Sequence, residues 1–241
     1  MPVRKLDIAE IWEINDPRDV PAYTISEAAH YLNIPPATIR SWVAGAKYTV
    51  KGGEKRRFPR VLDLQNADRT LLSFFNLVEA HVLRALRTHH AIKLDKIRRA
   101  LDYVKQEFGW KRPLIHQEFK TDGISLFVER LGYIVDAAAA GQIVMKEVMV
   151  HLERIEWEDS LAVRLFPFTR LDTEDAPRSV FIDPRYSFGR PILRESRIAT
   201  AVIAERYKAG DSIQSLAEDY GCSQLEIEEG VRCELRLTPA A

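Results

Sequence analysis

Residues 23–60 constrain the fold of this chain most, because they combine a helix start, a breaker, a second helix start and a basic hairpin. Thr24-Ile25-Ser26-Glu27 has the spacing of a capping box, in which the threonine hydroxyl accepts from the third helical amide and the glutamate reaches back. Apolar residues then recur at helical spacing until Asn33-Ile34-Pro35 interrupts them. This pattern predicts a helix that begins at Thr24 and ends near Asn33.

Pro36 is suited to begin a second helix, because its missing amide proton costs little in the first turn. Ile39, Trp42 and Val43 form an apolar stripe, which we expect to pack on the first helix. The opposite side carries Thr38, Arg40 and Ser41. In a helix-turn-helix this side presents residues to the major groove of DNA, so we expect these three to contact base edges.

A basic hairpin is predicted next, with strands at residues 47–51 and 56–62 and a turn at Gly52-Gly53. Between positions 47 and 60 a single acidic residue, Glu54, stands among six basic ones: Lys47, Lys51, Lys55, Arg56, Arg57 and Arg60. Such a density of positive charge favours phosphate binding through counterion release, although a solvated basic turn on a small domain would look similar. The order of the elements predicts a winged helix-turn-helix whose hairpin holds DNA phosphates.

The composition of the whole chain shows that the basic character of this segment is local. The 241-residue chain has a formal net charge of zero, with 46% hydrophobic and 29% charged residues, so it is not a general binder of polyanions. We find no apolar run of membrane-spanning length and no apolar segment behind the first residues, so we expect a cytoplasmic location and no membrane partner. Cys222 and Cys233 are too few for a disulfide framework and should stay reduced.

Two long helices are predicted after the hairpin. Residues 70–86 carry a broad apolar stripe, and the stripe of residues 94–108 stops at Gly109. Together they predict a helical hairpin. Either this hairpin is the core of one subunit, or it forms a dimer contact of the kind that palindromic DNA favours.

From Pro113 the apolar period changes to two. Residues 115–119 and 124–128 alternate on either side of Asp122-Gly123, which predicts a β-hairpin. We predict further strands at 133–135 and 161–166, a helix at 146–155, and a linker at 167–177. This middle part reads as a small α+β module that serves packing.

An extended stretch at 180–182 leads into an arginine-rich loop and three short helices. The first helix spans about 200–208, Asp211 is expected to cap the second, which ends at Gly221, and Ser223 opens the third with a second capping box. From position 211 to 235 there are seven acidic residues and one basic residue, which argues against DNA and favours a protein partner or solvent. The arginines before these helices are Arg185, Arg190, Arg194 and Arg197. Their guanidinium groups suit carboxylates, either on a partner or on the acidic helices of the same module.

The predicted fold is therefore α+β and mainly helical. We expect a winged helix-turn-helix DNA-binding domain at 1–62, a helical hairpin at 63–112, a small antiparallel β module with its linker at 113–176, and a C-terminal three-helix module at 177–241.

Two modules resemble known families. Residues 23–29 and 34–42 resemble the MerR-type winged helix. The tail resembles a small domain family of unknown function, numbered four hundred and thirty-three, through the following segments: Ile182-Asp183-Pro184, Gly189-Arg190-Pro191, Arg197-Ile198-Ala199-Thr200, Tyr207-Lys208-Ala209-Gly210 and Leu216-Ala217-Glu218-Asp219-Tyr220. That family usually has a Gly-Thr pair where this chain has Glu195-Ser196. The pairing of modules is similar to the larger VapB-type antitoxins, which are encoded beside a PIN-domain ribonuclease toxin.

The resemblance implies two partners, operator DNA and a PIN-domain ribonuclease, and a homodimer or a hetero-oligomer with the toxin. It implies an antitoxin that neutralises the toxin and represses its own operon, with no catalysis, cofactor or metal of its own. A PIN ribonuclease gathers acidic side chains around divalent metal, and an antitoxin can block it by placing an arginine there. The candidates are Arg185, Arg190, Arg194 and Arg197, with Arg236 near the C-terminus as a further one.

Two other classes of protein compete with this interpretation. A MerR-like regulator that senses a small molecule or a metal would need a sensor, but Cys222 and Cys233 lie eleven positions apart, wider than a metal clip. His81, His89 and His90 are expected on a surface or in a turn. An enzyme is disfavoured, because we find no Gly-rich phosphate loop, no nucleophile elbow and no paired metal-ligand motif.

Overall fold

The computed structural model describes residues 16–49, 55–64, 71–88, 92–132, 139–170 and 176–235. Within these ranges the chain is mainly helical with three antiparallel two-stranded sheets, which confirms the predicted α+β fold class. Several predictions lie outside the described residues: the Gly52-Gly53 turn, the strand at 133–135, and the residues Lys51, His89, His90 and Arg236.

The first two helices form as their start and stop signals predict. Helix α2 (Ile25–Leu32) begins with a complete capping box, in which Thr24 Oγ1 accepts from the Glu27 amide at 3.1 Å and Glu27 Oε2 accepts from the Thr24 amide at 2.8 Å. The helix ends at Asn33, which adopts the left-handed conformation that closes many helices. Helix α3 (Pro36–Ala44) follows, and it buries the predicted apolar stripe.

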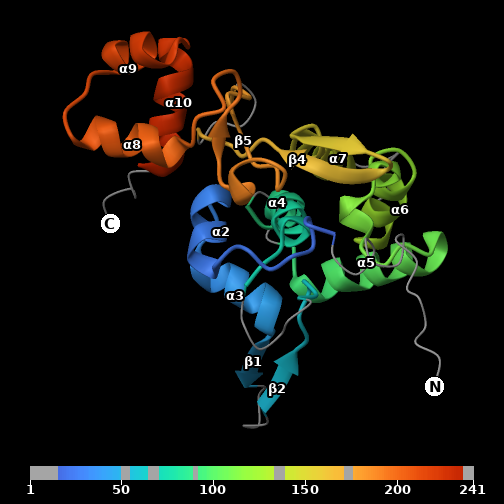
Figure 1. Cartoon of the computed structure of the whole chain (residues 1–241). Coiled ribbons are helices and arrows are strands. Elements are labelled where there is room, and N and C mark those ends of the chain that lie inside the picture. The colour runs from blue at the N-terminus through green and yellow to red at the C-terminus, as the bar shows by residue number, and fades with distance from the viewer. Residues whose placement is uncertain are drawn as a thin grey trace, which may run out of the picture.

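A β-hairpin follows α3 and projects from the rest of the molecule (Figure 1). Strands β1 (Ala46–Thr49) and β2 (Lys55–Phe58) are antiparallel, with Lys47 opposite Arg57 and Thr49 opposite Lys55. The second strand ends at residue 58, four residues before its predicted end. The chain then turns back to α3, where the Trp42 carbonyl oxygen accepts from the amides of Val61 and Leu62 at 2.8 and 3.0 Å. These bonds fix the base of the hairpin to the second helix.

Helix α4 (Phe74–Thr88) lies at the centre of the molecule, and every residue from Leu72 to Leu86 is buried. It packs chiefly against α7 (Ala139–Leu152), whereas α5 (Leu94–Phe108) packs chiefly against α6 (Gly123–Arg130). The two predicted helices therefore form, but each finds its main partner further along the chain. One hydrophobic core extends from Tyr23 to Ile182, so the first three predicted units share it.

The predicted β-hairpin around Asp122-Gly123 is wrong. Its first arm forms two short 3-10 turns, η1 (Pro113–Ile115) and η2 (Gln117–Phe119), and its second arm forms helix α6. The apolar residues of this arm alternate, but Ile124, Phe127 and Val128 also have helical spacing, and these are the residues that α6 buries. Packing against α5 favours the helical period.

The predicted strand at 161–166 is confirmed as β4 (Leu161–Leu165), which pairs with β3 (Ile155–Glu158). The helix predicted at 146–155 is α7, which begins earlier and ends at Leu152. Leu165 exchanges two backbone hydrogen bonds with Ile182, at 2.9 and 2.8 Å, and so joins β4 to the C-terminal unit.

The C-terminal unit contains two short paired strands, β5 (Val180–Phe181) and β6 (Ile192–Leu193), with the turn η3 (Ser187–Gly189) between them. Helices α8 (Thr200–Lys208), α9 (Ile213–Tyr220) and α10 (Gln224–Glu234) follow. In Figure 1 they form a group far from the β1–β2 hairpin. The unit has its own apolar cluster, formed by Val180, Leu193, Ile203, Leu216, Ala217, Ile227 and Cys233.

The predicted cap of α9 is displaced by one residue. Ser212, rather than Asp211, is the N-cap, and its hydroxyl accepts from the Ser215 amide at 3.1 Å. Asp211 instead pairs with Arg206 Nε at 2.6 Å. The carboxylate is drawn to a guanidinium of the preceding helix, which leaves the serine hydroxyl to satisfy the helix end.

Candidate nucleic-acid and partner-binding sites

The outer side of α3 carries the three residues predicted to read bases. Arg40 is exposed, and Thr38 and Ser41 are partly exposed. The Ser41 hydroxyl donates to the Thr38 carbonyl oxygen at 2.7 Å, which leaves its oxygen free to accept. Within the described part of the chain no carboxylate pairs with Arg40. The face is thus polar, solvent-accessible and cationic.

The basic residues of the hairpin lie in and beside one antiparallel ladder. Lys47 is in β1, and Lys55, Arg56 and Arg57 are in β2. Beyond the ladder, Arg60 Nε pairs with Asp63 Oδ1 at 2.8 Å, and about half of the Arg60 side chain remains exposed. Exposed pairs of this kind contribute little, so the Asp63 contact leaves Arg60 available to a phosphate.

A buried arginine holds the helix-turn-helix on the central helix. Arg84 of α4 donates through Nη1 to the carbonyl oxygen of Leu32, at the end of α2, at 3.0 Å. Its guanidinium also lies over the Phe168 ring, 5.7 Å from the ring centre. The bond satisfies one of the carbonyl oxygens that a helix end leaves without a partner. This contact fixes the orientation of α2, and with it α3, relative to the core.

A second arginine joins the segment before α2 to the core. Arg112 Nη2 and Nε contact Glu79 at 2.6 and 3.1 Å, and Nη1 contacts Asp19 at 2.6 Å. Burial alone would lower the pKa of Arg112, but the two carboxylates outweigh it and hold the pKa above its usual value.

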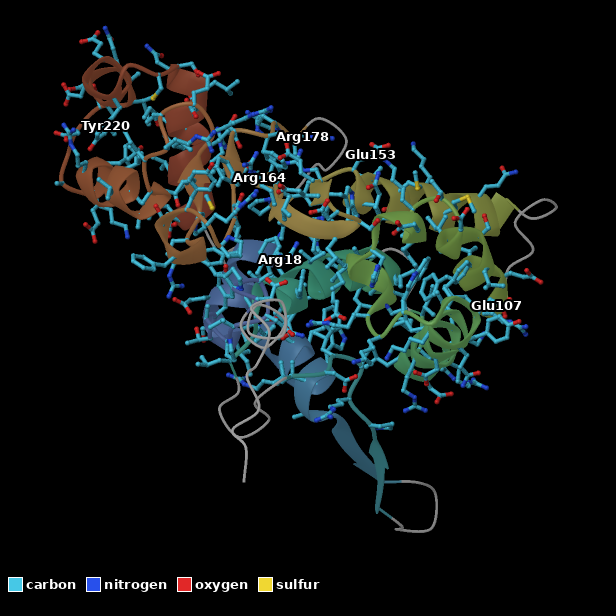
Figure 2. All side chains as sticks on the ribbon, turned by 45° about the vertical axis from the view of Figure 1, so that its right-hand side comes forward. Arg18, Glu107, Glu153, Arg164, Arg178 and Tyr220 are labelled. Atoms are coloured by element: carbon cyan, nitrogen blue, oxygen red, sulfur yellow. The ribbon has the colours of Figure 1, made fainter. Side chains whose placement is uncertain are left out.

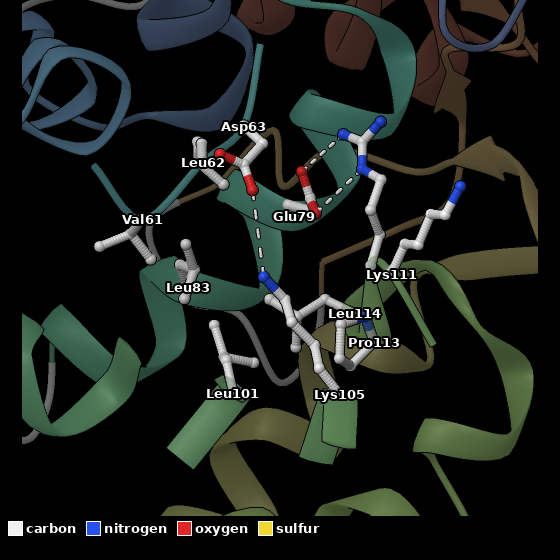
Figure 3. A pocket seen from close by; sticks show the side chains of 11 residues that line it. Val61, Leu62, Asp63, Glu79, Leu83, Leu101, Lys105, Lys111, Pro113 and Leu114 are labelled. Atoms are coloured by element: carbon white, nitrogen blue, oxygen red, sulfur yellow. Dashed lines mark hydrogen bonds and ion pairs between the residues drawn. The ribbon is translucent and has the colours of Figure 1, made fainter. Parts of the chain in front are cut away.

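Figure 3 shows Glu79, Asp63 and Lys105 around a cavity of about 10 Å³, which has room for about one water molecule.

Two of the four loop arginines are held by carboxylates of this chain. Arg190 Nη1 contacts Glu27 Oε1 of the α2 capping box at 2.5 Å. Arg185 binds both oxygens of Asp183 at 3.0 Å and contacts Glu158 at 2.7 Å. The predicted pairing with the acidic helices of the same module is wrong for Arg185 and Arg190, because their carboxylate partners are Asp183, Glu158 and Glu27, which lie outside those helices.

Asp183 is the buried anchor of this loop. Besides Arg185 it contacts Arg164 Nη2 of β4 at 3.3 Å, and the Arg164 guanidinium lies 4.4 Å from the centre of the Phe181 ring. Figure 2 shows Arg164 and Arg178 where the C-terminal helices meet the rest of the molecule. Asp183 therefore fixes the loop to β4.

The other two loop arginines are exposed and lie against aromatic rings. The Arg197 guanidinium is 4.9 Å from the Phe181 ring centre and 5.0 Å from that of Tyr186. Arg194 lies 5.6 Å from the Phe166 ring centre. Among the residues that the structure describes, neither arginine pairs with a carboxylate. No described carboxylate therefore neutralises the charge of either guanidinium, and both are available to a partner.

These two arginines are the first and last residues of a four-residue turn, 194–197, which we call the arginine turn. The Leu193 amide donates to the Ile198 carbonyl oxygen at 2.8 Å and closes the turn. Glu226 of α10 holds its tip, because Glu226 Oε1 accepts from the Glu195 amide at 2.7 Å. The second capping box is thus only half formed: Ser223 accepts from the Glu226 amide at 3.2 Å, but the glutamate side chain binds the turn instead. Burial raises the pKa of Glu226.

His81 is placed differently from its prediction. It is fully buried rather than on a surface or in a turn, and its Nε2 lies 3.1 Å from the His151 carbonyl oxygen. The centres of the two imidazole rings are 4.8 Å apart, and the Phe168 ring stacks on His81 at 5.4 Å. Burial lowers the pKa of His81 well below 6.5, and His151, Arg84 and Arg154 act in the same direction.

Three further observations bear on the competing classes. Cys222 and Cys233 form no disulfide with each other, and burial raises the pKa of Cys222. In the described ranges we find no group of three or more histidine, cysteine or acidic side chains placed to hold a metal ion. No described helix combines the length and the apolar character needed to cross a bilayer.

Two family models match the two ends of the chain. Residues 21–101 match the family described as "Putative DNA-binding HTH domain", and residues 180–232 match the family described as "Protein of unknown function (DUF433)". The first match covers α2, α3 and the basic hairpin, and the second covers the arginine-rich loop and the three C-terminal helices. The fold and the site thus combine a helix-turn-helix module with a small C-terminal domain.

Individual relatives resemble nearly the whole chain. The protein named "Putative antitoxin VapB45" from Mycobacterium tuberculosis is 28% identical over 229 residues, which is 88% of this chain and 93% of that protein. "Uncharacterized protein Rv2308" from the same organism is 22% identical over 223 residues, covering 88% and 90%. The crystal structure of Rv2018 from Mycobacterium tuberculosis matches with a TM-score of 0.61 and 25% identity, over 88% of this chain and 98% of that one. The similarity to VapB-type antitoxins that the motifs predict is confirmed.

Proposed function

We propose that this protein is the antitoxin of a toxin–antitoxin pair, with one surface for DNA and another for a PIN-domain ribonuclease. The observation that carries the proposal is the similarity to a named antitoxin over 88% of the chain, from the helix-turn-helix to the C-terminal unit. The separation of the basic hairpin from the C-terminal helices supports it, because two large partners can then be held at once (Figure 1).

On the DNA side, α3 enters the major groove, where Arg40, Thr38 and Ser41 contact base edges. Lys47, Lys51, Lys55, Arg56, Arg57 and Arg60 hold the phosphates on either side. An arginine reads guanine through two parallel hydrogen bonds, and the exposed guanidinium of Arg40, which no carboxylate of the described residues pairs with, supports that role. Binding at the promoter of its own operon represses transcription. A homodimer, or a hetero-oligomer with the toxin, presents two such helices to a palindromic site.

On the toxin side, the arginine turn enters the acidic cleft of the ribonuclease. A PIN nuclease needs divalent metal at the scissile phosphate, and a guanidinium placed among the metal ligands competes with that metal. Arg194 and Arg197 are the members of the predicted set that this geometry favours, since Arg185 and Arg190 are engaged within the chain. Arg236 stays a candidate from the sequence.

The test is inhibition of the purified ribonuclease encoded beside this chain, measured with a fluorescent RNA. The double variant R194E/R197E should lose inhibition at least a hundredfold, whereas K96E/K208E, which changes the net charge equally at two exposed lysines, should inhibit normally. Full inhibition by R194E/R197E would reject the role of the arginine turn. A wild-type protein that leaves the ribonuclease fully active would reject the antitoxin function itself.

A further inference from the structure

Phe188 is a large apolar side chain almost completely exposed to solvent. It is 93% exposed, whereas the next most exposed large apolar residue of the described ranges, Ile143, reaches 51%. It lies in the turn η3, within the loop that also carries Arg185 and Arg190. Tyr186, two residues earlier, is 39% exposed. Contiguous exposed apolar surface often marks an interaction site, and here two exposed aromatic residues lie within three positions of one loop.

The backbone that presents Phe188 is strained. Ser187, Phe188 and Gly189 all have positive φ, at 45°, 54° and 75°, although only the last is a glycine. Non-glycine residues avoid this region, and they are held there only when their surroundings impose it. Here the turn is fixed at both ends: the buried Tyr23 hydroxyl donates to the Gly189 carbonyl oxygen at 2.8 Å, and Asp183 accepts from the Arg185 amide at 3.0 Å.

Positive charge lies beside this aromatic tip. Tyr186 contacts the Arg197 guanidinium, with 5.0 Å between that group and the ring centre. Arg197 and Arg194 are exposed and pair with no carboxylate of the described chain. We call Phe188, Tyr186, Arg194 and Arg197 the tip surface, because Tyr186 is two positions from Phe188 and contacts Arg197, and Arg194 belongs to the same turn as Arg197. Aromatic residues and arginine are the types most enriched where binding energy concentrates.

We propose that Phe188 is the anchor of the tip surface and that it inserts into an apolar pocket, rimmed by carboxylates, on a partner protein. This inference rests on the proposed function, because the partner that fits is the acid-rich ribonuclease. The complementarity is electrostatic at the rim, where Arg194 and Arg197 meet carboxylates, and apolar at the centre, where Phe188 loses its water. A strained and rigid turn suits an anchor, since little freedom is lost when it docks.

The test is a binding titration between the purified chain and the purified PIN-domain protein encoded beside it. Phe188→Ala should weaken the dissociation constant about a hundredfold, which corresponds to about 2.8 kcal/mol at 1.4 kcal/mol per tenfold. Tyr207→Ala is the matched control, because Tyr207 is an exposed aromatic residue of α8, at 42%. It should bind within twofold of the wild type.

A second variant separates binding from folding. Phe188→Gly relieves the backbone strain, so its Tm should equal or exceed that of the wild type while its binding weakens at least as much as that of Phe188→Ala. If the wild type binds and both Phe188 variants bind equally well, the anchor is refuted and the antitoxin function stands. If the wild type does not bind, the proposed function fails and the anchor fails with it. Phe188 variants that lose DNA affinity but keep ribonuclease affinity would also overturn the inference.

Discussion

The Tyr23 hydroxyl donates a buried hydrogen bond to the Gly189 carbonyl oxygen, so that residues 166 positions apart in the sequence meet at 2.8 Å. Tyr23 immediately precedes the capping box of α2, and Gly189 belongs to the strained turn that carries Phe188. Beside this bond Arg190 contacts Glu27 of the capping box. The helix-turn-helix and the arginine-rich loop therefore meet through two adjacent polar contacts.

Gly189→Ala should destabilise the protein by about 2–4 kcal/mol, because the residue has φ +75° and a Cβ there would overlap the Tyr23 hydroxyl. Gly221→Ala is the control, since Gly221 has φ +63° but no heavy atom within 4 Å of the added Cβ. It should cost only the backbone strain, about 1–2 kcal/mol. Urea unfolding at a common pH measures both, and equal losses would show that the Tyr23 contact tolerates the methyl group.

Stability should fall as the pH drops below about 6.5. The folded pKa of His81 is lowered, so the unfolded chain binds more protons in acid and the free energy of unfolding decreases with falling pH. The slope from this group approaches about 1.4 kcal/mol per pH unit, and the contribution is fully present above pH 6.5.

His81→Phe tests this assignment, because phenylalanine keeps an aromatic ring beside Phe168 but cannot take up a proton. Below about pH 6.5, where the unfolded chain takes up the proton that folded His81 resists, the slope of the variant should be shallower than that of the wild type by up to about 1.4 kcal/mol per unit. His116, whose pKa is lowered by burial, contributes equally to both proteins and cancels in the difference. If the free energy of unfolding of the two proteins falls in parallel with pH, groups other than His81 cause the acid sensitivity.

Arg112→Met should cost about 3–5 kcal/mol, because it leaves the carboxylates of Glu79 and Asp19 partly buried without their guanidinium partner. Arg60→Ala breaks an exposed pair with Asp63 and should cost no more than about 1 kcal/mol. Thermal or urea unfolding compares the two. Losses of the same size would contradict the expectation that the partly buried pairs of Arg112 contribute more to stability than the exposed pair of Arg60.

The proposed DNA-binding residues should differ in how their substitution changes the salt dependence of DNA affinity. Arg56→Ala should weaken binding to every sequence and reduce the slope of log affinity against log salt by about one, as expected for a lost phosphate contact. Arg40→Ala should leave that slope nearly unchanged and lower the preference for the operator by about 1–3 kcal/mol. Lys208→Ala, at the exposed end of α8, should do neither. Titrations of labelled DNA at three salt concentrations test the assignment, which identical behaviour of the first two variants would refute.

Local signals in the sequence predicted the helix-turn-helix well. The capping box at Thr24, the interruption that begins at Asn33 and the early Pro36 act within a few residues, and the helices begin and end there as expected. The alternating residues 124–128 misled the prediction, because a short apolar run fits a strand and a helix alike until a packing partner decides. Here α5 supplies that partner.

The site was harder to predict, because its partners are distant in the sequence. Glu27, which holds Arg190, and Glu158, which holds Arg185 together with the nearby Asp183, are distant in the sequence, so the four arginines looked equivalent. The sequence predicts a surface or turn position for His81, because an apolar stripe leaves the other side of a helix to solvent, whereas in the structure α7 and Phe168 cover that side of α4. Phe188 gives no local signal either, and its exposure follows from the turn that Tyr23 and Asp183 fix.

The central claim is that α3 and the basic hairpin recognise the DNA upstream of this chain's own reading frame. The most direct test is the fluorescence anisotropy of that labelled promoter fragment, titrated with the purified protein, with and without the ribonuclease, against a scrambled fragment at one salt concentration. Affinity for the promoter should exceed that for the scrambled DNA by about a thousandfold or more, within the range of specific DNA-binding proteins. Equal affinities for the two fragments, both with and without the ribonuclease, would contradict the account.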